Sequence, residues 1–144
     1  MTRLEALQSG RLTDPVPMTS FPFAHTIDLS DVASDPREPS PCLPTARSVW
    51  FALHPPMPGT LLVDLAGSTP LDPLVRLYRQ VGRDPAASIF LGCASPVWNA
   101  QLWLAIPVEL GDVVLAQVGT SESVEGRLVV RAELPARPAR LARD

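Results

Sequence analysis

The sequence predicts an all-β protein: an antiparallel β-sandwich of the jelly-roll or immunoglobulin-like kind, with about eight strands and extended N- and C-terminal arms. Seventeen prolines and eight glycines divide the 144 residues into short segments, which argues against long helices. Several of these segments alternate apolar and polar side chains with the period of two that half-buried strands show. A chain of this length buries roughly two thirds of its unfolded surface, which suffices for one domain.

The strand pattern recurs along the chain, in order at residues 21–30, 48–53, 60–65, 74–79, 88–92, 100–107, 113–118 and 127–134. The first segment places His25 on the same face as its apolar residues. The second puts Phe51 and Trp50 on opposite faces. The third has leucine or valine at every second position and ends before Gly67. Each of the three is therefore expected to turn one face toward a core.

The later segments complete two sheets. The fourth and fifth are further short strands. In the sixth, the aliphatic side chains share one face and Trp103 lies on the other. The seventh is apolar on both faces except for Gln117, a pattern that suits a central strand. In the last, apolar residues alternate with arginine and glutamate, so that one face meets the core and the other meets water.

The chain divides into an N-terminal arm (1–20), one β-sandwich domain (21–134) and a basic C-terminal tail (135–144). A monomer gains nothing from apolar or basic arms, whereas an assembly subunit can order them against neighbours. The arms therefore supply candidate interface residues, namely Leu4, Leu7, Arg137, Arg140 and Arg143. The alternative for the N-terminal arm is a frayed, disordered terminus.

An ordered set of motifs runs through the domain: Pro-Cys at 41–42, SVWF at 48–51, GTLLVDLAGS at 59–68, LDPLVRLY at 71–78, Cys93, VLAQVG at 114–119 and GRLVV at 126–130. Together they resemble the bacterial pre-peptidase C-terminal domain over residues 21–134. That resemblance implies a small antiparallel β-sandwich of the type appended to secreted or surface proteins. The chain departs from the family pattern at Leu115, where a tyrosine is expected.

The resemblance also implies a disulfide between Cys42 and Cys93, because relatives carry cysteine at both places. A bond closing a loop that long would stabilise the fold by roughly 4 kcal/mol on the chain-entropy estimate. The alternative is two buried free thiols, since a protein made in a reducing cytoplasm starts with both reduced.

The sequence offers no framework for catalysis, a metal or a cofactor. It lacks nucleophile-elbow, phosphate-loop and dinucleotide motifs. His25 and His54 have no metal-type spacing to each other or to a cysteine. Asp64 and Asp72 flank a turn and are expected to bond its backbone. A calcium ion there is the weaker alternative, because residues 94–96 lack the acids that relatives carry after the second cysteine.

Two tryptophans are candidates for contact with a partner. Trp98 follows a proline in a loop, and Trp103 points away from the aliphatic face of its strand. Both can belong to a second core layer, to a protein interface or to a carbohydrate site where a pyranose ring stacks on the indole. Trp50 is expected in the core or at a sheet edge.

Two function classes lead, and we expect no enzyme. The first is a non-catalytic structural or interaction subunit, a decorating or attachment component of a larger assembly such as a phage head or tail. The second is a bacterial cell-surface accessory or adhesion module that binds glycan or a partner protein. The partners would be protein subunits, including copies of itself, or a glycan. The net charge of −3 does not favour nucleic acid.

The first residues lack the apolar segment of a signal peptide, and no stretch is long enough to span a membrane. We therefore expect synthesis in the cytoplasm and a final place in an extracellular particle such as a virion, with the cell surface as the alternative.

Overall fold

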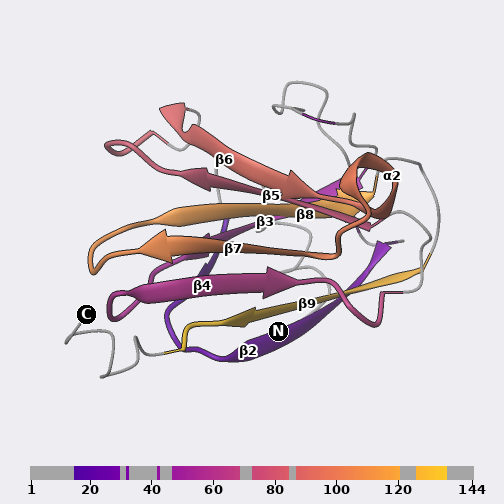
Figure 1. Ribbon diagram of the computed structural model, residues 1–144, viewed down its shortest axis with the longest axis horizontal. Coiled ribbons are helices and arrows are strands. Elements are labelled where there is room, and N and C mark those ends of the chain that lie inside the picture. Colours follow the sequence, from indigo (N-terminus) through magenta and orange to yellow (C-terminus); the bar gives the residue numbers. More distant parts are fainter. Residues whose placement is uncertain are drawn as a thin grey trace.

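The computed structural model describes residues 15–29, 32, 42, 47–68, 73–84, 87–120 and 126–135. Within them, two β-sheets pack face to face (Figure 1). The elements are β1 (Val16–Met18), β2 (Phe23–Asp28), β3 (Arg47–Leu53), β4 (Gly59–Asp64), β5 (Pro73–Arg79), β6 (Ile89–Ala94), the single turn of helix α2 (Pro96–Asn99), β7 (Trp103–Val108), β8 (Val114–Thr120) and β9 (Arg127–Glu133). The predicted all-β sandwich is confirmed. No helix of the described part is long and apolar enough to cross a bilayer.

The five-stranded sheet has the order β1-β3-β8-β5-β6, and the four-stranded sheet has the order β2-β9-β4-β7. All pairings are antiparallel except that of β1 with β3, which is parallel. Along the chain, each strand lies in the opposite sheet from the one before it, except for the hairpin of β5 and β6. Neither sheet can therefore be completed without the other.

Strand β1 corrects the predicted boundary between arm and domain. Residues 16–18 were assigned to the N-terminal arm, but they pair with β3 so that Val16 lies opposite Phe51. Val16 is only 9% exposed and packs in the core, and this burial holds the segment in the sheet. Residues 1–14 and 136–144, which contain all the candidate residues of the arms, lie outside the described residues.

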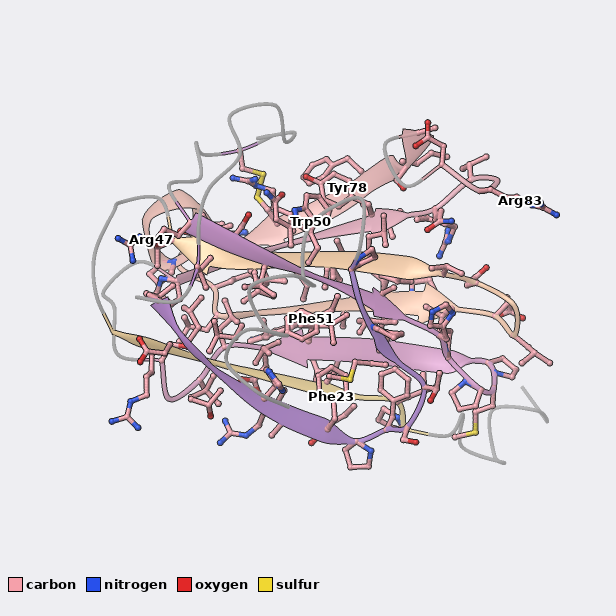
Figure 2. All side chains as sticks on the ribbon, turned by 180° about the vertical axis from the view of Figure 1, so that it is seen from behind. Phe23, Arg47, Trp50, Phe51, Tyr78 and Arg83 are labelled. Carbon is pink, nitrogen blue, oxygen red and sulfur yellow. A yellow bond between two sulfur atoms is a disulfide. The ribbon has the colours of Figure 1, made fainter. Side chains whose placement is uncertain are left out.

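The main core fills the space between the sheets, and its side chains follow the predicted alternation. Phe51 points inward from β3, where its ring centroid lies 6.3 Å from that of Phe23 on β2 (Figure 2). The His25 ring also points inward and meets Phe51 edge-on at 5.7 Å. Strands of both sheets add the fully buried side chains Leu53, Leu61, Val63, Val75, Leu77, Val114, Val118, Leu128 and Ala132.

The outward side of the five-stranded sheet is buried as well. Trp50, Ala52, Tyr78 and Leu115 form a second core there, on the side of the sheet away from Phe51 (Figure 2). The rings of Trp50 and Tyr78 have their centroids 5.3 Å apart, and each side chain is under 5% exposed. Trp50 thus lies in a core, which is one of the two locations expected for it.

Strand β8 lies in the middle of the five-stranded sheet, and all seven of its residues are buried. It pairs along its full length with β3 on one side and β5 on the other. Gly119 lies opposite Ser48, and a Cβ added to it would fall on the carbonyl oxygen of Arg47. Only glycine lets β3 approach β8 this closely.

We predict that Gly119→Ala lowers the free energy of unfolding by about 3 kcal/mol, because the new methyl group pushes the backbone of β3 away from β8. Gly92→Ala on β6 is the matched control, since a Cβ there makes only an ordinary contact at 3.8 Å with Leu104. Urea denaturation of both variants measures the effect. Equal stability of the two would show that β3 relaxes around the added methyl group.

Candidate functional site

The outward side of the four-stranded sheet is the exposed face of the sandwich. We call it the open face; it consists of Ala24, Thr26, Asp28, Thr60, Leu62, Asp64, Trp103, Ala105, Pro107, Arg127, Val129, Arg131 and Glu133, each of them exposed or half-buried. The outward side of the five-stranded sheet, in contrast, carries the second core. A partner that binds a sheet face of this protein therefore has the open face available.

Trp103 is the large aromatic residue of the open face. It begins edge strand β7, and its side chain is 50% exposed. This exposure rules out the second-core-layer alternative for Trp103 and leaves a protein interface or a carbohydrate site. Trp98 lies in helix α2, but its side chain is outside the described part of the structure.

Asp64 stands beside Trp103 and is fixed by the turn that follows β4. It lies opposite Trp103 on one side and Arg131 on the other. Its Oδ1 accepts a hydrogen bond of 2.7 Å from the backbone N–H of Ala66, so the carboxylate bonds the turn as predicted. Arg131 Nη1 donates to the carbonyl oxygen of the same Ala66 at 2.9 Å. The backbone of one residue, Ala66, thus bonds both charged side chains.

The same turn is attached to β9 by Ser68. Its hydroxyl accepts from the N–H of Val129 at 2.9 Å and lies 3.4 Å from the Val129 carbonyl oxygen. Gly67 permits the turn, because its φ of +92° lies in the left-handed region that disfavours a side chain. The turn, Asp64 and Arg131 therefore form one fixed unit at the edge of the open face.

A second exposed region lies at one end of the sandwich. Val114, the first residue of β8, is the register partner of both Leu53, the last residue of β3, and Arg79, the last residue of β5. The described connections at residues 54–58, 80–84 and 109–113 therefore meet at this end. We call this region the turn end; it lies at the left of Figure 1. Among the described residues, seven large apolar side chains are exposed, and five of them lie at or next to the turn end: Met57, Val81 and Leu110 in the connections, and Ile89 and Phe90 at the start of β6. The Phe90 ring lies 5.6 Å from that of Tyr78, on the outward side of the five-stranded sheet.

The turns at this end are held in place. Asp112 Oδ2 accepts from the N–H of Glu109 at 2.8 Å and lies 3.7 Å from Arg79 Nη2, and Arg79 also donates to the Pro107 carbonyl oxygen at 3.0 Å. The N–H of Gln80 donates to the Val113 carbonyl oxygen at 2.9 Å. These bonds tie the β5–β6 connection to the β7–β8 turn, which presents Leu110 with 69% of its surface exposed.

The turn end was missed by the analysis of the sequence. The available signal was the presence of apolar Val81 and Leu110 beside Gly82 and Gly111, because turns usually carry polar residues. The convergence of the turns depends on the topology, which the local pattern does not contain.

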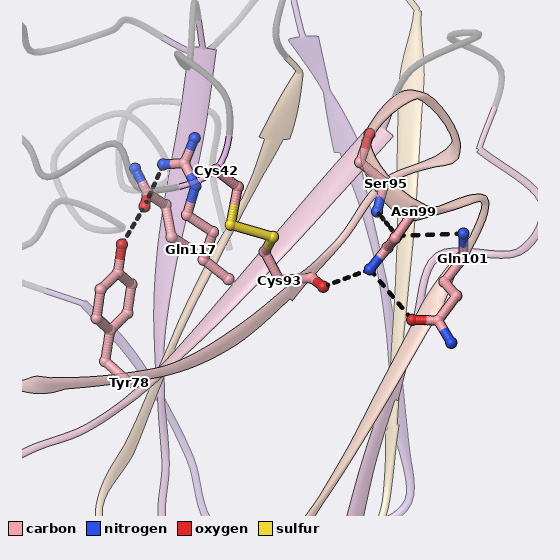
Figure 3. Close-up of a disulfide and its surroundings, with 8 residues drawn as sticks. Cys42, Tyr78, Cys93, Ser95, Asn99, Gln101 and Gln117 are labelled. Carbon is pink, nitrogen blue, oxygen red and sulfur yellow. Dashed lines mark hydrogen bonds between the residues drawn. A yellow bond between two sulfur atoms is a disulfide. The ribbon is translucent and has the colours of Figure 1, made fainter.

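Cys42 and Cys93 form a disulfide on the outward side of the five-stranded sheet, with their Cα atoms 6.9 Å apart (Figure 3). This is the pairing that the family resemblance implied. The chain after Cys93 is fixed by Asn99, whose Nδ2 donates to the Cys93 carbonyl oxygen at 3.0 Å and whose Oδ1 accepts from the N–H groups of Ser95 and Gln101. Asn99 thereby closes the crossing from β6 to β7.

A buried polar cluster lies on the same side of the sheet. Gln117 Oε1 accepts from Arg76 Nη1 at 2.8 Å and from the Tyr78 hydroxyl at 3.1 Å (Figure 3). Gln117 Nε2 is 3.4 Å from Ser48 Oγ. Arg76 and Gln117 are fully buried. Such bonds offset the cost of removing polar groups from water. The cluster is part of the second core rather than an accessible site.

The two histidines lie in different places: His25 is on the inward side of β2, and His54 is the first residue after β3, in a connection of the turn end. His25 faces the core, and desolvation by burial lowers its pKa from 6.5. In the part of the chain that the structure describes, no three His, Cys, Asp or Glu side chains come together in a way that could hold a metal ion. Asp72, the second acid considered for calcium, is outside the described residues.

No protein-family model matches the chain, and no curated protein matches it. Among solved structures, it is similar to the crystal structure of a mitogen derived from Yersinia pseudotuberculosis, with a TM-score of 0.51 and 14% identity over 82% of this chain and 91% of the mitogen. At that identity the likeness shows the fold alone. The resemblance to the pre-peptidase C-terminal domain stays a prediction.

We predict that the double substitution Cys42→Ser and Cys93→Ser lowers the free energy of unfolding by roughly 4 kcal/mol, because the unfolded chain gains the freedom of a long open loop. Urea denaturation of the oxidised wild type, the reduced wild type and the double variant measures it. The last two are expected to agree; a double variant as stable as the oxidised protein would contradict the prediction.

We predict that stability falls as the pH drops below 6.5, because the unfolded state then takes up a proton at His25 that the folded state resists. The loss continues until the pH reaches the lowered pKa of the folded protein. His25→Phe keeps a ring beside Phe51 and should reduce the dependence. Urea titrations across this range compare the two proteins; identical slopes for wild type and His25→Phe would refute the prediction.

Proposed function

We propose that this chain is a non-catalytic β-sandwich that attaches through its turn end to protein subunits of a larger assembly, such as the head or tail of a phage virion. The observation that carries the proposal is that five of the seven exposed large apolar side chains of the described residues lie at or next to this end: Met57, Val81 and Leu110 in the connections, and Ile89 and Phe90 in the first two residues of β6. Scattered apolar residues are normal on a protein surface, but a group of them favours an interaction site.

The composition of the turn end suits a protein partner. Arg83, Asp84 and Glu109 are exposed in the same connections as Val81 and Leu110, so charged side chains of both signs accompany the apolar ones. Arg83 is labelled in Figure 2. Protein interfaces have this arrangement of an apolar core and a polar rim. The mixed charges do not favour an anionic membrane or a nucleic acid.

The rigidity of the turns supports the proposal as well. The contact of Arg79 with Asp112 and the bond from Gln80 to Val113 hold the apolar side chains in place before a partner arrives. A surface that is ordered in advance loses less conformational entropy on binding. Burying the exposed half of a leucine or isoleucine contributes on the order of 1 kcal/mol, so the five side chains together can supply an attachment energy of several kcal/mol.

The disulfide supports a final place outside the reducing cytoplasm, since Cys42 and Cys93 are paired. A virion released by lysis meets this condition, and so does the cell surface. The non-catalytic part of the proposal is supported by the position of His25, whose ring is directed at Phe51 in the core rather than at an exposed region. The partners at the turn end would be other subunits or second copies of this chain.

We predict that Leu110→Ser weakens incorporation into the parent particle about tenfold, and that adding Val81→Ser and Ile89→Ser weakens it at least a hundredfold, because each change removes apolar area from the contact. Tagged proteins are mixed with particles from cells that lack this gene, and occupancy is measured against concentration. Leu102→Ser, at the opposite end and 37% exposed, is the matched control.

All these variants should keep their free energy of unfolding within about 0.5 kcal/mol for each surface substitution. Equal occupancy of the wild type and the triple variant would show that the attachment surface is not the turn end. Wild-type protein that joins no particle, and that remains monomeric by light scattering, would refute the assembly role itself.

A further inference from the structure

The open face carries an aromatic ring, a carboxylate and a guanidinium in one row across three neighbouring strands. Trp103 on β7 lies opposite Asp64 on β4, and Asp64 lies opposite Arg131 on β9. Neighbouring strands are about 4.8 Å apart, so the row spans roughly 10 Å. An indole ring beside hydrogen-bonding groups of both kinds can contact the apolar face and the hydroxyl groups of one sugar ring at the same time.

The polar groups of the row are positioned in advance. Both are anchored on Ala66: its N–H bonds Asp64 Oδ1, and its carbonyl oxygen accepts from Arg131 Nη1. Among the described residues, this leaves Asp64 Oδ2 and Arg131 Nη2 without a hydrogen-bond partner in the protein. An acceptor and a donor with fixed positions are what a pair of neighbouring hydroxyl groups requires.

Small residues border part of the row, and its other neighbours on the open face are Leu62, Val129 and Glu133. Ala24 stands opposite Arg131 on β2, Ala105 is the next outward residue of β7, and Ala66 and Gly67 form the adjoining turn. All four are exposed, and none has a side chain longer than a methyl group. The Trp103 side chain, 50% exposed, is therefore not covered by a tall neighbour, and a flat ring can approach it.

The charges of the open face indicate which ligand fits. The open face carries three acidic residues, Asp28, Asp64 and Glu133, and two basic residues, Arg127 and Arg131. It therefore has no excess of positive charge, which disfavours a polyanion such as nucleic acid or a sulfated chain. Trp103 is also the one large apolar side chain of this face that is exposed. A large protein interface would need more apolar area than that.

We infer that the open face binds a neutral saccharide, with Trp103 stacked on the apolar face of a pyranose ring, Asp64 accepting hydrogen bonds from its hydroxyl groups and Arg131 donating one to a ring or hydroxyl oxygen. The site lies away from the turn end and is independent of the attachment proposed there.

The test uses the full chain on an array of immobilised neutral oligosaccharides, with sialylated and uronic-acid oligosaccharides as a separate set. The best neutral binder is then titrated calorimetrically, with an expected Kd on the order of 0.1 mM for a shallow site. Trp103→Ala should weaken binding at least tenfold, whereas Trp103→Phe should retain most of it. Asp64→Asn should weaken it to a similar degree, because an amide nitrogen replaces one acceptor oxygen.

Leu110→Ser at the turn end should bind the saccharide like the wild type, so a failure of the attachment proposal leaves this test intact. Thermal melting checks that each variant is folded, and the exposure of Trp103 makes large losses of stability unexpected. Absence of binding to every neutral saccharide, binding to the acidic set alone, or undiminished binding by Trp103→Ala would each overturn the inference.

Discussion

The rest of the structure depends on the close packing of strand β8 between β3 and β5. Both of its faces are buried, one against the main core and the other against the second core. Gly119 lets the backbone of β8 approach that of β3 closely. The side-chain amide of Gln117 contacts the polar groups of Arg76, Tyr78 and Ser48. Because both cores contain residues of this strand, a substitution that displaces β8 changes the packing on both sides of the five-stranded sheet.

The burial of both sides of one sheet determines where binding can occur. Because the second core occupies most of the outward side of the five-stranded sheet, the exposed surfaces that stand out among the described residues are the open face and the turn end. They differ in chemistry: one has a single exposed aromatic ring among charged and small residues, and the other has five exposed apolar side chains, three in the connections and two at the start of β6. This difference is why we assign a saccharide to the first and a protein partner to the second.

Much of the fold could be predicted because alternation is a local property. The opposite faces of Phe51 and Trp50, the inward direction of His25 and the central position of the strand around Gln117 all follow from the residues themselves. Strand β1 could not be predicted in this way. It has three residues, contains Pro17, and owes its place to a parallel partner far along the chain.

The candidate sites could be predicted only in part, for the same reason. Trp103 was recognised because its own strand shows it on the polar side. The row that joins it to Asp64 and Arg131 depends on the register of β4 with two strands from distant parts of the sequence. The turn end likewise exists only after three connections have been brought to one end of the sandwich. Local patterns contain neither kind of information.

The order of the strands has a further consequence for how the molecule withstands damage. The first two strands lie at the edge of different sheets, β1 beside β3 and β2 beside β9. Proteolytic removal of this one short stretch of chain would therefore uncover two strand edges at once, each with a row of unsatisfied backbone groups. Such edges are templates for pairing between molecules, so the intact N-terminal strands protect the sandwich from aggregation on both of its sheets.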